Sequence, residues 1–143
     1  MRVVEPPLAA VAFLTRIPVG RLVQLDGDAV RRAAPLFPLV GGAIGAFGGG
    51  IVDVASGPLP SLAAAALGLG AVALLTGGLH LDALADTADG LGGTTRERRL
   101  EIMRDHAVGS FGAVALVVVL LFQASLLAEM ATFDEAGVTD AGR

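Results

Sequence analysis

The chain has 143 residues, about the length of one domain, and 54% of them are hydrophobic while only 17% are charged. Glycine is abundant, and tryptophan and tyrosine are absent, a composition that suits membrane helices packed through small side chains better than an aqueous core. The absence of cysteine excludes disulfides, thiolate metal sites and cysteine nucleophiles, and the net charge of −4 gives no support to nucleic-acid binding.

Residues 1–37 form an N-terminal segment that we do not expect to cross a membrane. Its apolar positions up to Ile17 predict a short interfacial helix that ends near Pro18. Arg16 and Pro18 interrupt the apolar run, and no small-residue cleavage site follows it, so the segment does not match a signal peptide. The polar stretch 24–34 predicts a surface loop or a short helix.

Three apolar stretches follow, each close to the ~20 residues that a helix needs to cross a bilayer. They cover residues 38–55, 61–79 and 108–131. In the first stretch, Gly41, Gly45 and Gly49 form a ridge of small residues that predicts a close contact with another helix. We therefore expect an all-α, polytopic integral membrane protein that forms a single membrane domain.

Arginine placement predicts the orientation of these spans. Five arginines precede the first span and four lie in segment 80–107, whereas the turn between the first two spans has no cation. By the positive-inside rule, the N-terminus and segment 80–107 then face the cytoplasm, on the inner side of the cell membrane. Residues 132–143 form a polar tail after the third span.

Segment 80–107 holds the most informative pattern of the chain, the acidic residues Asp82, Asp86 and Asp89. On a helix, the spacing i, i+4, i+7 puts the three carboxylates on one face. Three like charges in one place repel each other and are costly to desolvate beside a bilayer, so a hard divalent cation with oxygen ligands is the natural candidate to hold them together. The alternative is a solvated helix end without a ligand.

An arginine-rich stretch follows the acidic cluster, and a new helix is predicted to begin near Thr94 or Thr95. Arg96, Arg99 and Arg104 beside an acidic metal site suit a polyphosphate substrate. The metal would neutralise charge on the leaving group, and the guanidinium forks would bind the remaining phosphate oxygens. The alternative is a topology signal that needs no substrate.

Three further polar residues have open interpretations. His80 is either a helix-end or interfacial histidine or a contact to the substrate. Asp105 either caps a helix or joins the metal site. His106, next to Asp105, suggests acid/base chemistry, but we favour a loop histidine.

The chain resembles the cobalamin synthase family, whose members are adenosylcobinamide-GDP ribazoletransferases. The blocks that carry this resemblance are Phe-Leu-Thr-Arg-Ile-Pro-Val at 13–19, Gly-Leu-His-Leu-Asp at 78–82, Asp-Thr-Ala-Asp-Gly-Leu-Gly-Gly at 86–93, Arg-Arg-Leu-Glu-Ile-Met-Arg-Asp at 98–105 and Gly-Ser-Phe-Gly at 109–112. The short Asp-x-x-Asp-Gly at 86–90 is also similar to a motif of the CDP-alcohol phosphotransferases, but the rest of their signature is not found. The resemblance covers nearly all of this chain and only the first part of the family's length.

The resemblance implies a magnesium-dependent membrane enzyme that joins adenosylcobinamide-GDP to α-ribazole, or to its 5′-phosphate, and releases GMP in the last stage of cobalamin biosynthesis. By likeness, Asp82, Asp86 and Asp89 would hold Mg²⁺ and the diphosphate and carry catalysis. Arg104 and Asp105 would face the same pocket. The corrinoid and ribazole substrates come from the resemblance alone.

Other functions stay open beside this one. The chain could be a non-catalytic fragment or half of a split enzyme, completed by a C-terminal half or by further copies of itself. It could also be another membrane phosphotransferase that acts on a substrate linked to a nucleoside diphosphate. An ion-binding transport subunit ranks lowest, because it needs acidic groups deep within a span. The expected surroundings are membrane lipid, and no nucleic acid.

Overall fold

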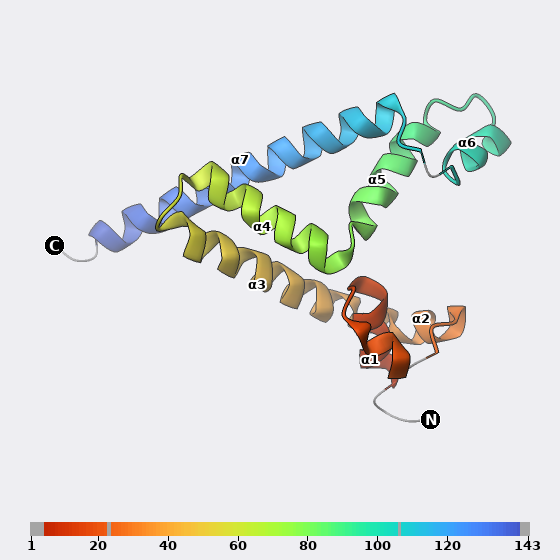
Figure 1. Cartoon of the computed structure of the whole chain (residues 1–143), viewed down its shortest axis with the longest axis horizontal. Helices are drawn as coiled ribbons and strands as arrows, with labels where there is room; N and C mark the ends of the chain where they lie inside the picture. The colour runs from red at the N-terminus through yellow and green to blue at the C-terminus, as the bar shows by residue number, and fades with distance from the viewer. Residues whose placement is uncertain (1–4, 23, 106, 141–143) are drawn as a thin grey trace.

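The computed structural model describes residues 5–22, 24–105 and 107–140, and of residues 133–140 it describes the backbone only. All regular structure in these ranges is helical, so the all-α prediction is confirmed (Figure 1). The elements in chain order are α1 (Glu5–Leu14), η1 (Pro18–Leu22), α2 (Gly27–Ala33), η2 (Ala34–Leu36), α3 (Phe37–Ser56), α4 (Ser61–Thr76), α5 (Leu79–Gly90), α6 (Arg96–Ile102) and α7 (Ser110–Asp140).

The N-terminal helices pack together through small side chains at one end of the molecule. Helices α1 and α2 bury the alanines Ala9, Ala10, Ala29 and Ala33 against each other. The carboxylate of Asp26 accepts a hydrogen bond from the amide of Ala29 at 2.7 Å and so caps the start of α2. The polar stretch 24–34 was predicted to be a surface loop or a short helix, and the structure has the short helix α2 within it.

Within the described residues, two helical segments are long and apolar enough to cross a membrane by themselves. They are Gly27–Ser56, which runs through α2, η2 and α3, and Ser110–Thr132 of α7. These segments contain nearly all of the predicted spans 38–55 and 108–131. Helix α7 continues through most of the predicted polar tail, and residues 141–143 lie outside the described part of the chain.

The predicted span 61–79 differs from the structure. Helix α4 ends at Thr76, and the chain bends by 91° before α5 begins, so the pair forms a broken span or a re-entrant segment rather than one straight helix. The cause is local: Gly77 and Gly78 have φ values of +68° and +73°, and the amide of Gly78 bonds the carbonyl of Ala73 at 2.8 Å. Glycines in this left-handed conformation terminate helices, whereas hydropathy continues unbroken through them.

Helices α3 and α4 run antiparallel and approach closely through two glycines (Figure 1). A Cβ atom built on Gly68 would lie 2.9 Å from the carbonyl oxygen of Gly48, and one built on Gly48 would lie 2.6 Å from a methyl group of Val72. Small residues are what allow two membrane helices to pack this tightly. The face of α3 that is buried here carries Ile44, Gly48 and Val52.

The described residues show no contact at the predicted ridge of Gly41, Gly45 and Gly49. These three glycines are exposed, and no described atom lies within 4 Å of a Cβ built on any of them, outside their own helix. The ridge lies one residue away from the Gly48 face, which on an α-helix is a rotation of about 100°. Among the described residues, the face of α3 that packs against another helix is therefore the neighbouring one, which carries Gly48.

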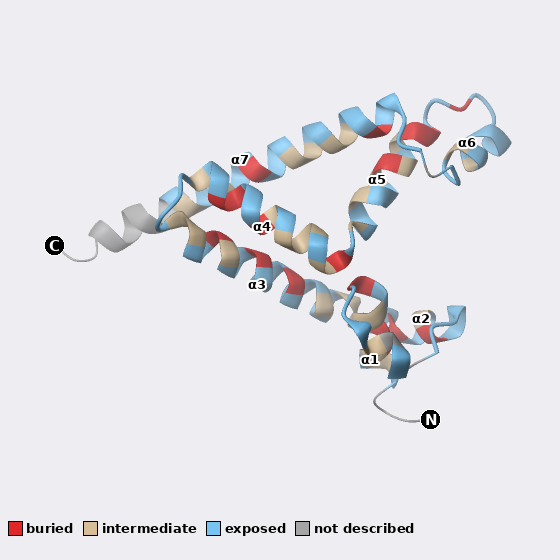
Figure 2. Cartoon of the chain, in the orientation of Figure 1, coloured by how far each residue is buried: buried red, intermediate tan, exposed pale blue. Residues whose placement is uncertain are grey.

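Helix α5 joins the end of α4 to the start of α7, and α7 then returns toward the turn between α3 and α4 (Figure 1). The buried residues of α4, α5 and α7 follow their facing sides, while the outward sides are exposed (Figure 2). Large apolar side chains are also exposed, among them Leu39 of α3, Leu74 of α4, and Phe111 and Leu121 of α7. An apolar outer surface is what helices surrounded by lipid require.

Candidate functional site

The three aspartates of the acidic cluster lie on one helix, α5, as predicted. Their environments differ sharply. Asp82 is exposed, Asp86 is half-buried, and Asp89, near the end of α5, is only 9% exposed. The three carboxylates therefore cannot be treated as equivalent ligands.

Asp89 binds the start of α7. Its Oδ2 accepts a hydrogen bond from the amide of Gly109 at 2.7 Å, and its Oδ1 accepts one from the amide of Gly112 at 2.8 Å. Because α7 begins at Ser110, these amides belong to the helix N-terminus, where backbone donors lack partners within the helix. Gly109 has no side chain that could cap the helix, so a carboxylate from α5 does so, and its negative charge suits the positive end of the helix dipole.

The two glycines are needed for this contact. A Cβ atom on Gly109 or on Gly112 would collide with the carboxylate of Asp89, and a Cβ on Gly112 would also lie 3.0 Å from the carbonyl oxygen of Ala85. The block Gly-Ser-Phe-Gly at 109–112 thus has a structural explanation: it lets the backbone of α7 approach the acidic helix.

A magnesium site fits two of the carboxylates better than all three. Within the described residues, no group of three or more His, Asp or Glu side chains is arranged to hold a metal ion. Asp82 and Asp86 are one turn apart on one face of α5, and Mg²⁺ is typically bound by one or two carboxylates, with substrate phosphates and water as the other ligands. The third predicted ligand, Asp89, has both oxygens engaged by α7.

An open groove of about 550 Å³ lies beside the bend between α4 and α5. Its wall comes from the end of α1 and the residues after it, the bend itself, α5, and the start of α7. Arg16 and Asp82 are its charged lining residues, and Phe13, Val108 and Leu116 are among the apolar ones. The groove can therefore hold a ligand that combines a charged part with an apolar part.

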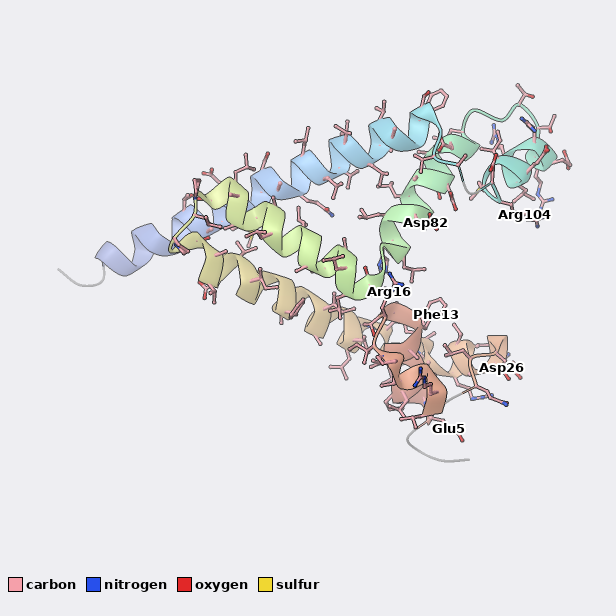
Figure 3. The ribbon with its side chains drawn as sticks, viewed as in Figure 1. Glu5, Phe13, Arg16, Asp26, Asp82 and Arg104 are labelled. Atoms are coloured by element: carbon pink, nitrogen blue, oxygen red, sulfur yellow. The ribbon has the colours of Figure 1, made fainter. Side chains whose placement is uncertain are left out.

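Arg16 lines this groove, and the sequence interpretation did not include it among the candidate site residues. Its amide donates to the carbonyl of Leu75 at 2.7 Å, which ties the N-terminal segment to the end of α4. Figure 3 shows the Arg16 side chain directed toward the foot of α5, the helix that carries Asp82. The block Thr-Arg-Ile-Pro at 15–18 was part of the family resemblance, and it was the only sequence signal that could have pointed to this arginine.

The arginine-rich helix begins as predicted. Helix α6 is capped by Thr95, whose hydroxyl accepts a hydrogen bond from the amide of Arg98 at 3.2 Å. Arg98 also forms an exposed ion pair with Glu101 at 2.7 Å. Arg99 donates from Nε to the carbonyl of Gly93 at 2.8 Å, which fixes the loop between α5 and α6. Arg99 thus has a structural role in the described fold.

The other predicted substrate-binding residues are exposed. His80 lies in the first turn of α5, Arg96 begins α6, and Arg104 and Asp105 follow α6. Figure 3 places Arg104 at the α6 end of the molecule and Asp82 nearer the foot of α5. The binding roles of these four residues stay predictions, and His106 lies outside the described residues.

Apolar helices long enough to span a bilayer, with the polar helices α5 and α6 joined at one end, define a helical membrane protein. The family model described as cobalamin-5-phosphate synthase matches residues 6–139, and the chain belongs to this family.

Curated relatives of this chain are named adenosylcobinamide-GDP ribazoletransferase. The relative from Shewanella amazonensis is 43% identical over 138 residues, which cover 96% of this chain and 53% of the relative. The relative from Ralstonia nicotianae is 48% identical over 125 residues, which cover 85% of this chain and 48% of the relative. The chain spans about half the length of the curated relatives it matches. No solved structure matches it.

Proposed function

We propose that this chain carries the diphosphate-binding part of a magnesium-dependent adenosylcobinamide-GDP ribazoletransferase. The reaction joins the adenosylcobinamide phosphate to α-ribazole, or to its 5′-phosphate, and releases GMP. The observation that carries the proposal is the placement of Asp82 in a groove that also contains Arg16, with Asp86 one turn further along the same face of α5. Family membership and the names of the relatives supply the substrates.

In the proposed reaction, a ribazole hydroxyl attacks the phosphorus nearest the corrinoid. The new phosphorus–oxygen bond forms as the bond to GMP breaks, and the hydroxyl proton is released. Mg²⁺ held by Asp82 and Asp86 would neutralise charge on the diphosphate and on the departing GMP. The chain's own contribution is to place the phosphates against these carboxylates, and Asp89 keeps α5 fixed on α7 while it does so.

The distribution of arginines supports a cytoplasmic position for this site. The arginines of the N-terminal segment and those of segment 80–107 would lie on the same side of the cell membrane. Nucleotide-linked substrates would then reach the groove from the cytoplasm, and the exposed apolar sides of α3, α4 and α7 would contact lipid.

The half-length match favours a second form of the same proposal. The chain spans about half the length of these relatives. In this second form, transfer uses the region of the family that the chain does not match, or a further copy of the chain. In that form, the chain binds the diphosphate and the metal, and the added part completes the corrinoid site.

GMP release tests the proposal. The purified chain in lipid nanodiscs is supplied with Mg²⁺, adenosylcobinamide-GDP and α-ribazole, alone and with the uncovered portion of the Ralstonia nicotianae relative. We expect GMP release that is lost in Asp86→Asn. The control variant Asp28→Asn, at an exposed position on α2, should release GMP at the wild-type rate. No GMP release under either condition, or equal rates for Asp86→Asn and the wild type, would overturn it.

A further inference from the structure

Arg16 is held in place by its backbone. Thr15, which is buried, donates from its hydroxyl to the carbonyl of Val11 at 2.7 Å and accepts from the amide of Ile17 at 3.3 Å. With the bond from the Arg16 amide to Leu75, this fixes the chain on both sides of the arginine. The position of Arg16 at the bend between α4 and α5 is therefore set before any ligand binds.

The path of the Arg16 side chain is fixed as well. A Cβ atom on Gly77 would lie 2.7 Å from Cδ and 2.8 Å from Cγ of Arg16, so the aliphatic part of the arginine lies directly over this glycine. Gly77 also has a positive φ, a conformation that other residues adopt only with strain. The glycine thus provides both the bend of the chain and the space through which Arg16 reaches the groove.

The guanidinium of Arg16 has no carboxylate partner among the described residues. The ion pairs found there join Arg31 to Asp28 and Arg98 to Glu101. Arg16 instead lines the groove together with Asp82, beside the apolar side chains of Phe13 and Val108. Arg16 and Asp82 are both exposed, so an anion from solution can reach the guanidinium.

We propose that Arg16 is a substrate-binding residue that holds a phosphate group of a diphosphate-linked substrate in the groove that Asp82 also lines. The inference rests on the proposed function, because it takes the ligand class from it. A guanidinium binds phosphate oxygens bidentately, and the fixed backbone and side-chain path reduce the entropy lost on binding. Arg16 would then bind the phosphate in the same groove in which Asp82 would hold a cation.

A purely structural role gives a different expectation. Arg16 lies at the C-terminal end of α4, where a positive charge interacts favourably with the helix dipole and so stabilises the fold. In that case, removal of the charge would lower the stability of the protein and leave the anion affinity of the folded protein unchanged.

Pyrophosphate binding separates the two roles. Calorimetry on the chain in lipid nanodiscs, with and without Mg²⁺, compares the wild type with Arg16→Gln, Arg16→Lys, Asp82→Asn and the control Arg31→Gln, which changes an exposed arginine on α2. We expect Arg16→Gln to weaken pyrophosphate binding at least about tenfold in both conditions, because a charge-assisted bidentate contact is lost. Arg16→Lys should lose less of the pyrophosphate affinity. Asp82→Asn should lose only the increase in affinity that Mg²⁺ causes, and Arg31→Gln should bind pyrophosphate as tightly as the wild type.

Equal pyrophosphate affinity in the wild type and Arg16→Gln, or no binding to the wild type at millimolar concentration, would overturn the inference. If Arg16→Gln does not fold, the comparison rests on Arg16→Lys. This variant keeps the positive charge but lacks the planar guanidinium group, so an unchanged pyrophosphate affinity would overturn the bidentate contact. Pyrophosphate binding that depends on Arg16 without any GMP release would contradict the proposed transferase and leave the anion site standing. GMP release together with pyrophosphate binding that does not depend on Arg16 would support the proposed transferase and overturn the role of Arg16.

Discussion

The carboxylate of Asp89 accepts a hydrogen bond from the amide of Gly112, 23 positions later in the chain, at 2.8 Å. This contact, with its companion at Gly109, does for α7 what a capping side chain would do from within the helix. It also divides the acidic motif by role. Asp82 and Asp86 stay available to a ligand, whereas Asp89 holds the acidic helix against the next membrane helix.

Asp89→Ala should destabilise the protein. The substitution leaves the amides of Gly109 and Gly112 without their partner at a nearly buried position, and we expect a loss of about 2 kcal/mol in the free energy of unfolding. Asp89→Asn should lose less, because an amide oxygen can still accept one of the bonds. Denaturation of the micelle-solubilised protein, followed by circular dichroism, measures both. Stability equal to the wild type in Asp89→Ala would show that the cap contributes nothing.

Gly112→Ala should have a similar effect for a steric reason. The new Cβ would collide with the Asp89 carboxylate and meet the carbonyl oxygen of Ala85, so α5 and α7 must separate, at a cost of about 1–3 kcal/mol. Gly49→Ala is the matched control, since it is also a glycine inside a membrane helix but faces open space among the described residues. The same unfolding assay compares them, and equal stability of the two variants would contradict the contact.

Gly68→Ala tests the packing of α3 on α4. Its Cβ would lie 2.9 Å from the backbone oxygen of Gly48, which cannot move aside as a flexible side chain could. We expect a loss of about 1–3 kcal/mol in the unfolding assay. Gly45→Ala, on the exposed ridge of α3, serves as the control and should be close to neutral. A destabilised Gly45→Ala with a neutral Gly68→Ala would place the packing face where the sequence pattern first indicated it.

Asp82→Asn and Asp86→Asn should each lower magnesium-dependent GMP release at least about a hundredfold, because charge stabilisation at the transferring phosphate is lost. Asp82 is exposed and Asp86 is half-buried, and neither carboxylate has a hydrogen bond or an ion pair among the described residues, so circular dichroism and membrane insertion should stay unchanged. Rates within a few-fold of the wild type in both folded variants would exclude them as metal ligands in the reaction.

Local patterns explain which parts of the structure could be predicted. The helix that carries the aspartates and the start of α6 at Thr95 follow from residue spacing and capping, which involve neighbours in the sequence. The bend at Gly77 and Gly78 was missed because hydropathy does not report backbone conformation. Both glycines lie inside an apolar run that continues past them.

The features that could not be predicted from the sequence depend on contacts between distant parts of the chain. The cap from Asp89 to α7 and the passage of Arg16 over Gly77 join residues that are 20 or more positions apart, so no spacing rule contains them. The glycine ridge of α3 shows a related limit. The pattern identified a close contact between helices, but only the structure shows that Gly48, rather than Gly49, faces α4.

The most direct test of the proposed site is the uptake of Mg²⁺ by the chain in the presence of pyrophosphate, measured by isothermal titration calorimetry in lipid nanodiscs. The proposal predicts that the wild type and Asp28→Asn bind Mg²⁺, and that Asp82→Asn and Asp86→Asn lose most of this binding while staying folded. No detectable uptake by the wild type, or the same uptake by all four proteins, would contradict a magnesium–diphosphate site on α5.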